Sequence, residues 1–187
     1  MYNLKNYWGN RLDPNSHFAD DSIFLGKNKN FIKSNITENS NILEIGPGIG
    51  RLVECYKNCK VTGLDITDKY KQRLIDNTKK YNIEYDFIIN TSEILLPFKD
   101  NEFDYVISSL VLLHQPPQNI NTILKEMKRV GRKVIVISSV GEFLNKSSHC
   151  FNHNYKKICE EESLVYVEHD NEQYENHTTG YTYITIE

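Results

Sequence analysis

The chain has 187 residues, of which 39% are hydrophobic and 11% aromatic, so it is long enough for one domain with a core and lacks the composition of a disordered chain. Its formal net charge of −3 gives no overall attraction to nucleic acids or anionic membranes, which disfavours a nucleic-acid partner. No apolar stretch approaches the roughly 20 residues of a membrane span, and the first residues lack a signal-peptide layout. We therefore expect a cytoplasmic protein without membrane association, whose four cysteines stay reduced.

The first forty residues precede the first predicted strand and are expected to contain a lid segment and a helix. The segment 7–18 begins with Tyr7 and Trp8 and is a candidate lid over a ligand. The stretch from Asp20 to Ile36 is predicted to be a helix lying over a sheet. Its apolar residues are Ile23, Phe24, Phe31 and Ile32.

Five short apolar runs follow and are predicted to be strands. They are Asn41–Ile45, Val61–Leu64, a strand from about Tyr85 to Ile89, Phe103–Ser108 and Val134–Ile137. Each run is continuous rather than alternating, which is typical of strands covered on both faces.

The segments between these runs are predicted to be helical. Asp68–Tyr81 carries an apolar side and has Thr67 as a candidate N-cap. Asn119–Val130 places apolar residues at i, i+3, i+4 and i+7, and Gly131 suits its C-terminal end. Alternating strands and helices predict an α/β fold with a mostly parallel, doubly wound sheet.

The C-terminal part has a different pattern. Tyr181–Ile186 alternates in polarity, and Leu164–Val167 precedes it across a polar stretch. These two segments are predicted to form an antiparallel hairpin that closes one edge of the sheet.

The most informative segment is the run LEIGPGIG, Leu43–Gly50. A predicted strand leads into three glycines at alternate positions, and a helix is expected to follow, so that backbone N–H groups can approach a ligand. Asp65 comes about 20 residues later at the end of the second strand, where an acid can accept hydrogen bonds from both ribose hydroxyls of a nucleoside.

The spacing of the glycines disfavours a dinucleotide. In a G-x-G-x-x-G fingerprint the third glycine would occupy the position of Arg51, whereas here it falls one residue early, at Gly50. Glu44 would also face a pyrophosphate unfavourably. A cationic nucleoside without phosphates fits better.

Four ordered motifs resemble those of class I S-adenosylmethionine-dependent methyltransferases, in the small-molecule, methyltransferase type 11-like branch. LEIGPGIG and GLDIT look like the first two motifs. LPFKDNEFDYVISSLVLLH (Leu96–His114) and ILKEMKRVGRKVIVIS (Ile123–Ser138) are similar to the later ones. The resemblance implies a Rossmann-like fold in a single domain, 1–187, with an N-terminal lid and helix (1–40), a cofactor-binding core (41–139) and a C-terminal helix with the strand pair (140–187).

The resemblance also implies the cofactor, S-adenosyl-L-methionine, and its contacts. Glu44 would orient the methionine amino group, Asp65 would take the ribose hydroxyls and Ile66 would lie against the adenine. Ser92 or Glu93 falls where the family has an acid near the adenine, and Ser108 and Ser109, at the end of the fourth strand, should lie near the sulfonium. The loop residues expected around the cofactor are Gly46, Pro47, Gly48 and Gly50.

His114 is the candidate catalytic residue, because it follows the fourth strand, where the methyl group would be delivered. A histidine suits the general base that a hydroxyl acceptor needs. A purely packing role for His114 in the loop before Pro116 stays open. In the lid segment, His17 is noted, and Arg11 either pairs with the methionine carboxylate or is an ordinary surface residue.

Other motifs are set aside. Cys55 and Cys59 lack the third nearby cysteine of an iron–sulfur site, and no zinc spacing fits the ligand types near residue 150, so no metal is expected. Those ligand types are His149, Cys150, His153 and Cys159. Base methylation of nucleic acid is disfavoured because the segment after the fourth strand lacks an aromatic residue to stack a flipped base.

The sequence therefore predicts a methyltransferase acting on a small molecule, glycan or other metabolite, with oxygen favoured as the acceptor atom. One alternative is a catalytically silent S-adenosylmethionine-binding subunit of a methyltransferase complex. A less favoured one is an NAD-dependent oxidoreductase. A homodimer or a partner subunit completing the site is left open.

Overall fold

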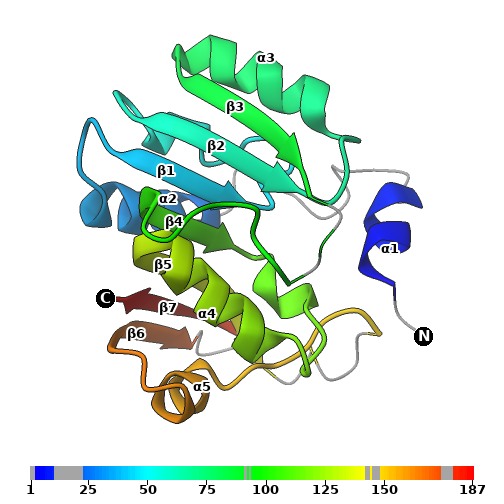
Figure 1. Ribbon diagram of the computed structural model, residues 1–187, viewed down its shortest axis with the longest axis vertical. Helices are drawn as coiled ribbons and strands as arrows, with labels where there is room; N and C mark the ends of the chain where they lie inside the picture. The colour runs from blue at the N-terminus through cyan, green and yellow to red at the C-terminus, as the bar shows by residue number, and fades with distance from the viewer. Residues whose placement is uncertain are drawn as a thin grey trace.

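The fold is organised around a seven-stranded mixed sheet with strand order β3-β2-β1-β4-β5-β7-β6 (Figure 1). The computed structural model describes residues 3–10, 23–90, 92, 94–141, 144, 148–173 and 179–187. The strands are β1 (Asn41–Ile45), β2 (Lys60–Asp65), β3 (Glu84–Ile89), β4 (Phe103–Ser109), β5 (Gly131–Gly141), β6 (Tyr166–Gln173) and β7 (Thr179–Ile186). The first five are parallel, and β7 runs antiparallel to both β5 and β6.

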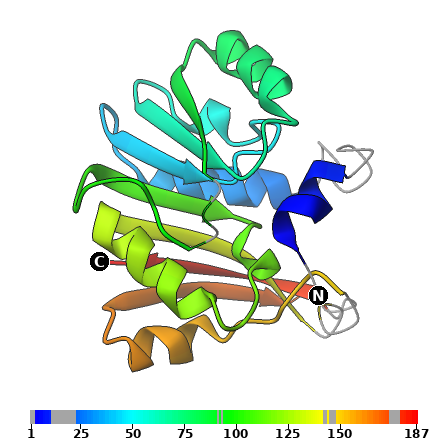
Figure 2. The ribbon, with the colours of Figure 1, turned by 45° about the vertical axis from the view of Figure 1, so that its right-hand side comes forward.

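Helices cover both faces of this sheet (Figure 2). The helical elements are α1 (Leu4–Asn10), α2 (Ile23–Asn35), η2 (Val53–Cys55), α3 (Lys71–Tyr81), η3 (Leu112–His114), α4 (Ile120–Val130) and α5 (Tyr155–Glu161). The α4–α5 side forms one apolar cluster with Leu43, Val106 and Val134. The α2 side forms a second cluster with Ile42, Ile107 and Ile135. Successive strand residues alternate between the two clusters, as expected for a sheet buried on both faces.

The five predicted parallel strands are confirmed, with one correction about burial. β3 forms an edge of the sheet, so its outer backbone and several side chains face solvent. Ile88 and Ile89 are 37% and 48% exposed, although the continuous apolar run predicted burial on both faces. A continuous apolar run therefore does not distinguish a central strand from an edge strand.

The helix expected after the glycine loop is absent, and the segment contains only the three-residue turn η2. Nine residues separate Gly50 from the start of β2, and a chain that must reverse direction within them has no room for several helical turns. The backbone makes i to i+3 bonds instead, for example from Cys55 N to Leu52 O at 2.7 Å.

The helix predicted over 68–81 begins three residues late, at Lys71, and Thr67 is not its N-cap. The Thr67 hydroxyl accepts a hydrogen bond from Lys69 N (3.3 Å), and Lys71 N bonds to Asp68 O (2.9 Å). A local turn thus uses the groups that would have capped a longer helix. Gly131 follows α4 as expected but is extended, because it already starts β5.

The C-terminal hairpin is confirmed and is longer than the sequence indicates. β6 extends through the polar residues His169–Gln173, with a register shift between His169 and Glu172. Buried residues of β7, including Ile184 and Ile186, join the α4–α5 cluster. Among the helices that the structure describes, none has the length and apolar character to cross a bilayer.

Candidate active site

A cavity of about 360 Å³ opens at the carboxyl ends of β1, β2 and β4. Strand β1 lies between β2 and β4, and the strand order therefore reverses direction at β1. Open α/β sheets bind ligands at the carboxyl ends of the strands beside such a reversal. The lining includes the glycine loop, the strand ends, the start of α2 and part of α1. The candidates from the sequence that line it are Glu44, Gly46, Pro47, Gly48, Asp65, Ile66, Ser92 and His114.

The three glycines of the loop serve different purposes. Gly46 has φ +67, and a Cβ there would lie 2.5 Å from Val111 Cγ2, so this position tolerates no side chain. Gly48 has φ +53, and a Cβ added there would meet nothing within 4 Å, which leaves its backbone open to the cavity. Gly50 does not line the cavity. Its close contact is with Leu74 of α3, where a Cβ would approach to 2.8 Å.

Asp65 ends β2 with its carboxylate at the cavity wall. Burial raises its pKa to about 6, against the opposing effect of backbone N–H groups of Thr67, Ile66 and Gly48. Thr67 N lies 3.3 Å from Asp65 Oδ1. Because burial raises this pKa in spite of those backbone donors, hydroxyl donors on a ligand would further stabilise the charged form of Asp65.

Glu44 is the second carboxylate of the wall and is only 3% exposed. Burial raises its pKa to about 7, although a hydrogen bond from Tyr85 Oη at 2.7 Å favours the charged form. Gly63, the neighbour of Glu44 on β2, makes room for that contact, since a Cβ there would lie 2.5 Å from Tyr85 Oη. A cationic ligand group would hold Glu44 ionised near neutral pH.

The remaining predicted cofactor contacts are partly displaced. Ser92 lines the cavity, and its backbone N–H bonds to Asn90 Oδ1 at 3.1 Å. Asn90, which no sequence motif marks, lines the cavity as well. It directly follows β3, just as Asp65 ends the neighbouring strand β2, so the two residues lie at the same edge of the sheet. Glu93 lies outside the described residues. Of the two serines expected near the sulfonium, Ser109 lines the cavity and Ser108 is fully buried in β4, because adjacent strand residues point to opposite sides.

The opposite wall comes from α1 and η3, and the loop around residue 149 packs against both. His114 meets Trp8 edge to face at 4.9 Å between ring centroids, and Tyr7 stacks on His149 at 4.4 Å. Nδ1 of His114 lies 2.9 Å from the carbonyl oxygen of His149. Leu4 and Trp8 of α1 line the cavity, and the lid over 7–18 stays a prediction. His17 and Arg11 lie outside the described residues.

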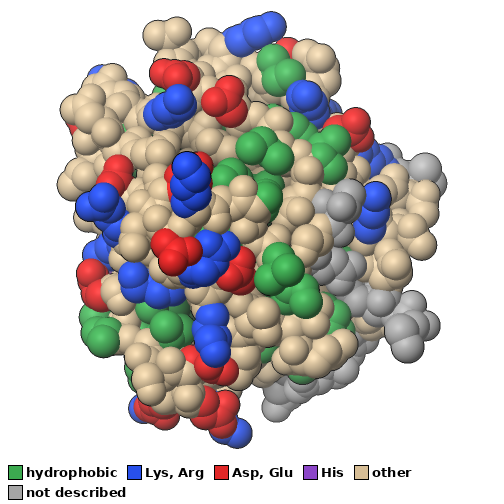
Figure 3. Space-filling view, in the orientation of Figure 1, with side chains coloured by type: hydrophobic (Ala, Val, Ile, Leu, Met, Phe, Trp, Pro, Cys, Tyr) green, Lys and Arg blue, Asp and Glu red, His purple; other side chains and the backbone are tan. Residues whose placement is uncertain are grey.

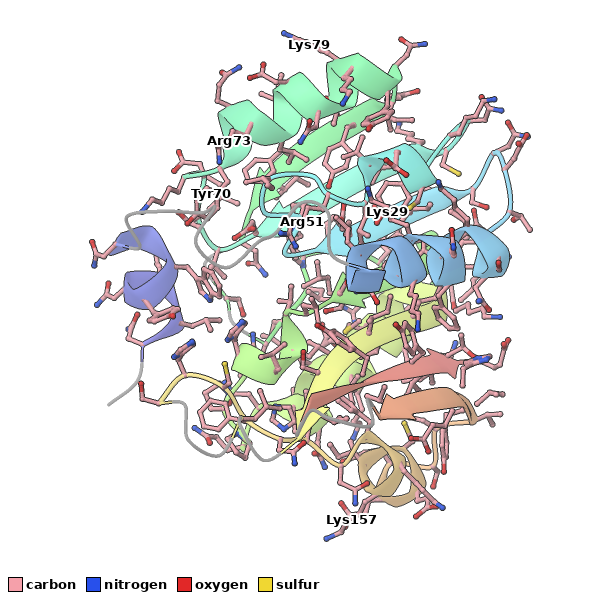
Figure 4. All side chains as sticks on the ribbon, turned by 180° about the vertical axis from the view of Figure 1, so that it is seen from behind. Lys29, Arg51, Tyr70, Arg73, Lys79 and Lys157 are labelled. Atoms are coloured by element: carbon pink, nitrogen blue, oxygen red, sulfur yellow. The ribbon has the colours of Figure 1, made fainter. Side chains whose placement is uncertain are left out.

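Arg51 and Tyr70 also line the cavity. In the sequence, Arg51 is notable only because it stands where a dinucleotide fingerprint has its last glycine. Figure 4 shows it beside the N-terminal end of α2, with Tyr70 on the side toward α1. The loop therefore brings one guanidinium to a wall that also holds two carboxylates.

Residues 43–135 match the family model of the methyltransferase domain. The chain belongs to the class I S-adenosylmethionine-dependent methyltransferases. The ubiquinone/menaquinone biosynthesis C-methyltransferase UbiE of Rickettsia typhi is 33% identical over 115 residues, which are 57% of this chain and 45% of the relative. The chain thus spans about half the length of the curated relatives it matches.

Solved structures of distant methyltransferases share this fold. The 1,6-didemethyltoxoflavin-N1-methyltransferase of Burkholderia thailandensis, solved with bound S-adenosylhomocysteine, has a TM-score of 0.73 at 13% identity, over 98% of this chain and 86% of that one. A putative methyltransferase from Haloferax volcanii, in complex with the Trm112 methyltransferase activator, gives 0.71 at 15% identity, over 100% and 98%.

The cofactor of this methyltransferase family is S-adenosylmethionine, and the wall described above fits it. The side-chain-free backbone at Gly46 and Gly48 leaves room beside β1, and Asp65 offers the acceptor that a ribose needs. The two carboxylates suit a ligand that carries an ammonium and a sulfonium and no phosphate. This fit replaces the dinucleotide alternative considered from the sequence.

Proposed function

We propose that this methyltransferase moves the methyl group of S-adenosylmethionine to a small-molecule acceptor held between Trp8 and the end of β4. The observation that carries the proposal is that one cavity joins the wall of Glu44, Gly48 and Asp65 to the wall of Trp8 and His114. A cofactor on the first wall would thus share one space with an acceptor on the second.

The acceptor wall is mainly apolar. Its side chains are Leu4, Trp8, Leu110, Val111 and Ile123, with Ser109, His114 and Gln115 as polar groups. Few charged groups are present to bind an ionic acceptor, so shape and apolar contact would select it. The face shown in Figure 3 has Lys and Arg interspersed with Asp and Glu, an arrangement that provides no single-sign field for a polyanion on that face.

We infer that the acceptor atom is carbon rather than oxygen. The similarity to a protein named as a C-methyltransferase favours carbon, and the apolar wall suits an acceptor whose reacting atom carries no charge. The preference for oxygen drawn from the sequence has no such support. His114 as a general base stays a prediction, with its Nε2 as the basic atom while Nδ1 donates to the His149 carbonyl.

The chain's own contribution to the reaction is positioning. The sulfonium of the cofactor supplies an activated methyl carbon. Asp65 would hold the ribose of the donor and Glu44 its methionine amino group. The rings of Trp8 and His114 would restrict where the acceptor can lie. Such alignment can contribute about 7–11 kcal/mol to a displacement reaction.

The first test is calorimetric binding of S-adenosylhomocysteine to the wild type and to Asp65→Ala. Micromolar-range binding that weakens at least tenfold, about 1.4 kcal/mol, supports the cofactor position. Asp68→Ala is the matched control, because Asp68 is exposed and its replacement removes the same charge three residues away. Absence of binding, or equal loss in both variants, would overturn the cofactor assignment.

The silent-subunit alternative is kept because one structural neighbour was solved with an activator partner. A small chain with an open acceptor wall would then need a second subunit for turnover. Transfer of a labelled methyl group to quinol, phenol or other electron-rich carbon acceptors by the isolated chain would exclude this alternative. Cofactor binding without transfer to any acceptor would favour it.

A further inference from the structure

The structure assembles a set of metal-ligand side chains that sequence spacing does not reveal. His114, at the end of η3, and the pair His149 and Cys150 are separated by 35 residues, yet one ligand atom from each lies within 4.8 Å of the others. Of the two other candidate ligands considered from the sequence, His153 bonds through Nε2 to Leu112 O, and Cys159 of α5 is buried in the α4–α5 cluster. The fold therefore selects three of these side chains and separates the rest.

Backbone contacts hold the two segments together. Phe151 N donates to Leu113 O at 2.7 Å, one residue from each end of the cluster. His153 fixes the same loop to η3 through Leu112 O at 3.1 Å. The position of His149 and Cys150 beside His114 is thus set by the main chain and does not depend on contacts among the three side chains.

We propose that His114, His149 and Cys150 bind a divalent ion of the zinc class. Two imidazoles and a thiolate are ligands preferred by zinc and chemically similar ions. Cys150 Sγ lies 3.6 Å from His114 Nδ1. With Zn–S of about 2.3 Å and Zn–N of about 2.0–2.1 Å, a tetrahedral ion sets a sulfur–nitrogen edge of about 3.6 Å, so this pair already has the required separation.

The third ligand requires a small movement. A tetrahedral nitrogen–nitrogen edge is about 3.3 Å, so the ring of His149 would approach by roughly 1.5 Å at most from its present position within 4.8 Å of the others. His149 lies in a turn outside the helices and strands, where such a shift costs little. Metal binding would replace the hydrogen bond from His114 Nδ1 to the His149 carbonyl.

The location gives the ion a role in the cavity. Three protein ligands leave a fourth position for water or for a heteroatom of a small molecule, as in zinc sites that bind substrates. His114 lines the cavity, whereas His149 and Cys150 do not, so the ion would lie on the side of the His114 ring that faces the loop at 149 and would fix that ring at the acceptor wall. In this arrangement His114 is a metal ligand rather than a general base.

The test is titration of the full chain with Co²⁺ and competition by Zn²⁺. We expect one equivalent of Co²⁺, with thiolate-to-cobalt charge-transfer absorption that zinc abolishes. Cys150→Ser should lose that absorption, and His149→Asn should weaken binding at least tenfold. Cys159→Ala and His169→Asn are matched controls that remove one residue of each ligand type away from the site, and both should bind as the wild type does.

A second measurement uses the unchanged protein and therefore does not depend on variant folding. Cys150 is the one cysteine of the four that is not buried, so an alkylating reagent should modify it first. Zinc should slow this modification at least tenfold. Absence of stoichiometric binding, the same cobalt spectrum in Cys150→Ser, or alkylation unaffected by zinc would overturn the proposal. Binding of S-adenosylhomocysteine in chelator tests the proposed function separately.

Discussion

The two walls of the cavity are built in different ways. The cofactor wall consists of strand ends and a glycine loop, so backbone conformation sets most of its shape: Gly46 has no room for a side chain, and Asp65 is fixed by the end of β2. The acceptor wall carries rings from α1 and η3, which the loop at 149 supports, and these segments are distant in the sequence. We expect substitutions at the glycines of the first wall to lower stability, substitutions at its carboxylates to change the pH dependence of stability and binding, and substitutions on the second wall to change selectivity and local opening.

The largest expected effect is at Gly46. Gly46→Ala places a Cβ on a residue with positive φ, which costs about 1–2 kcal/mol. The same Cβ would press against Val111, and such overpacking costs about 1–3 kcal/mol more. Gly48→Ala carries the conformational cost alone, since nothing lies within 4 Å of its Cβ. Urea unfolding should therefore show a larger loss for Gly46→Ala than for Gly48→Ala. Equal losses would mean that Val111 yields and the loop is not set by packing.

The next effect concerns Glu44 and pH. Its folded pKa of about 7 lies above the unfolded value of 4.5, so the folded state binds more protons in between. The free energy of unfolding should therefore rise as the pH falls from 8 to 5.5, by about 2 kcal/mol from this group. Glu44→Gln keeps an acceptor for Tyr85 and should be more stable than the wild type at pH 8.

The measurement is urea unfolding of the ligand-free protein at both pH values, and the variant should lose most of the slope that the wild type shows. Glu54 and Glu126 have lowered pKa values, and their contribution is lost below about 4.5, outside this window. A slope unchanged in Glu44→Gln would show that Glu44 is already charged and paired in the folded state.

A smaller effect is expected on cofactor affinity. The pKa of Asp65 is about 6, and only its ionised carboxylate can accept from both ribose hydroxyls. Affinity for S-adenosylhomocysteine should fall about tenfold between pH 7.5 and pH 5 from this group alone. In Asp65→Asn the affinity should be lower at pH 7.5, and the part of the pH dependence due to this group should disappear. A wild-type profile that stays flat down to pH 5 would remove Asp65 from the ribose contact.

The sequence predicts the backbone-built cofactor wall better than the acceptor wall. The strand positions, the parallel sheet and the place of Asp65 follow from apolar runs and from the fixed geometry of such a sheet. The helix expected after Gly50 is absent because the connection to β2 is too short for it. Of Ser108 and Ser109, both expected near the sulfonium, only Ser109 reaches the cavity, because successive residues of a strand face opposite sides. The cluster of His114, His149 and Cys150 depends on a backbone bond between Phe151 and Leu113, and no local pattern encodes it.

The smallest effect is expected on the acceptor wall, at Tyr7. Its ring stacks on His149 at 4.4 Å and meets Trp8 at 5.2 Å, and aromatic pairs of this kind contribute about 0.5–1.5 kcal/mol. In Tyr7→Leu, hydrogen exchange of the α1 amides should speed up by a corresponding factor, while exchange in β1 and β2 stays unchanged. Lys5→Ala, at an exposed position of the same helix, should leave exchange in α1 near the wild-type rate, because propensity alone would change it little. If Tyr7→Leu accelerated exchange equally in α1 and β1, the ring would support the whole fold, and the division between a backbone-built cofactor wall and a side-chain-built acceptor wall would not hold.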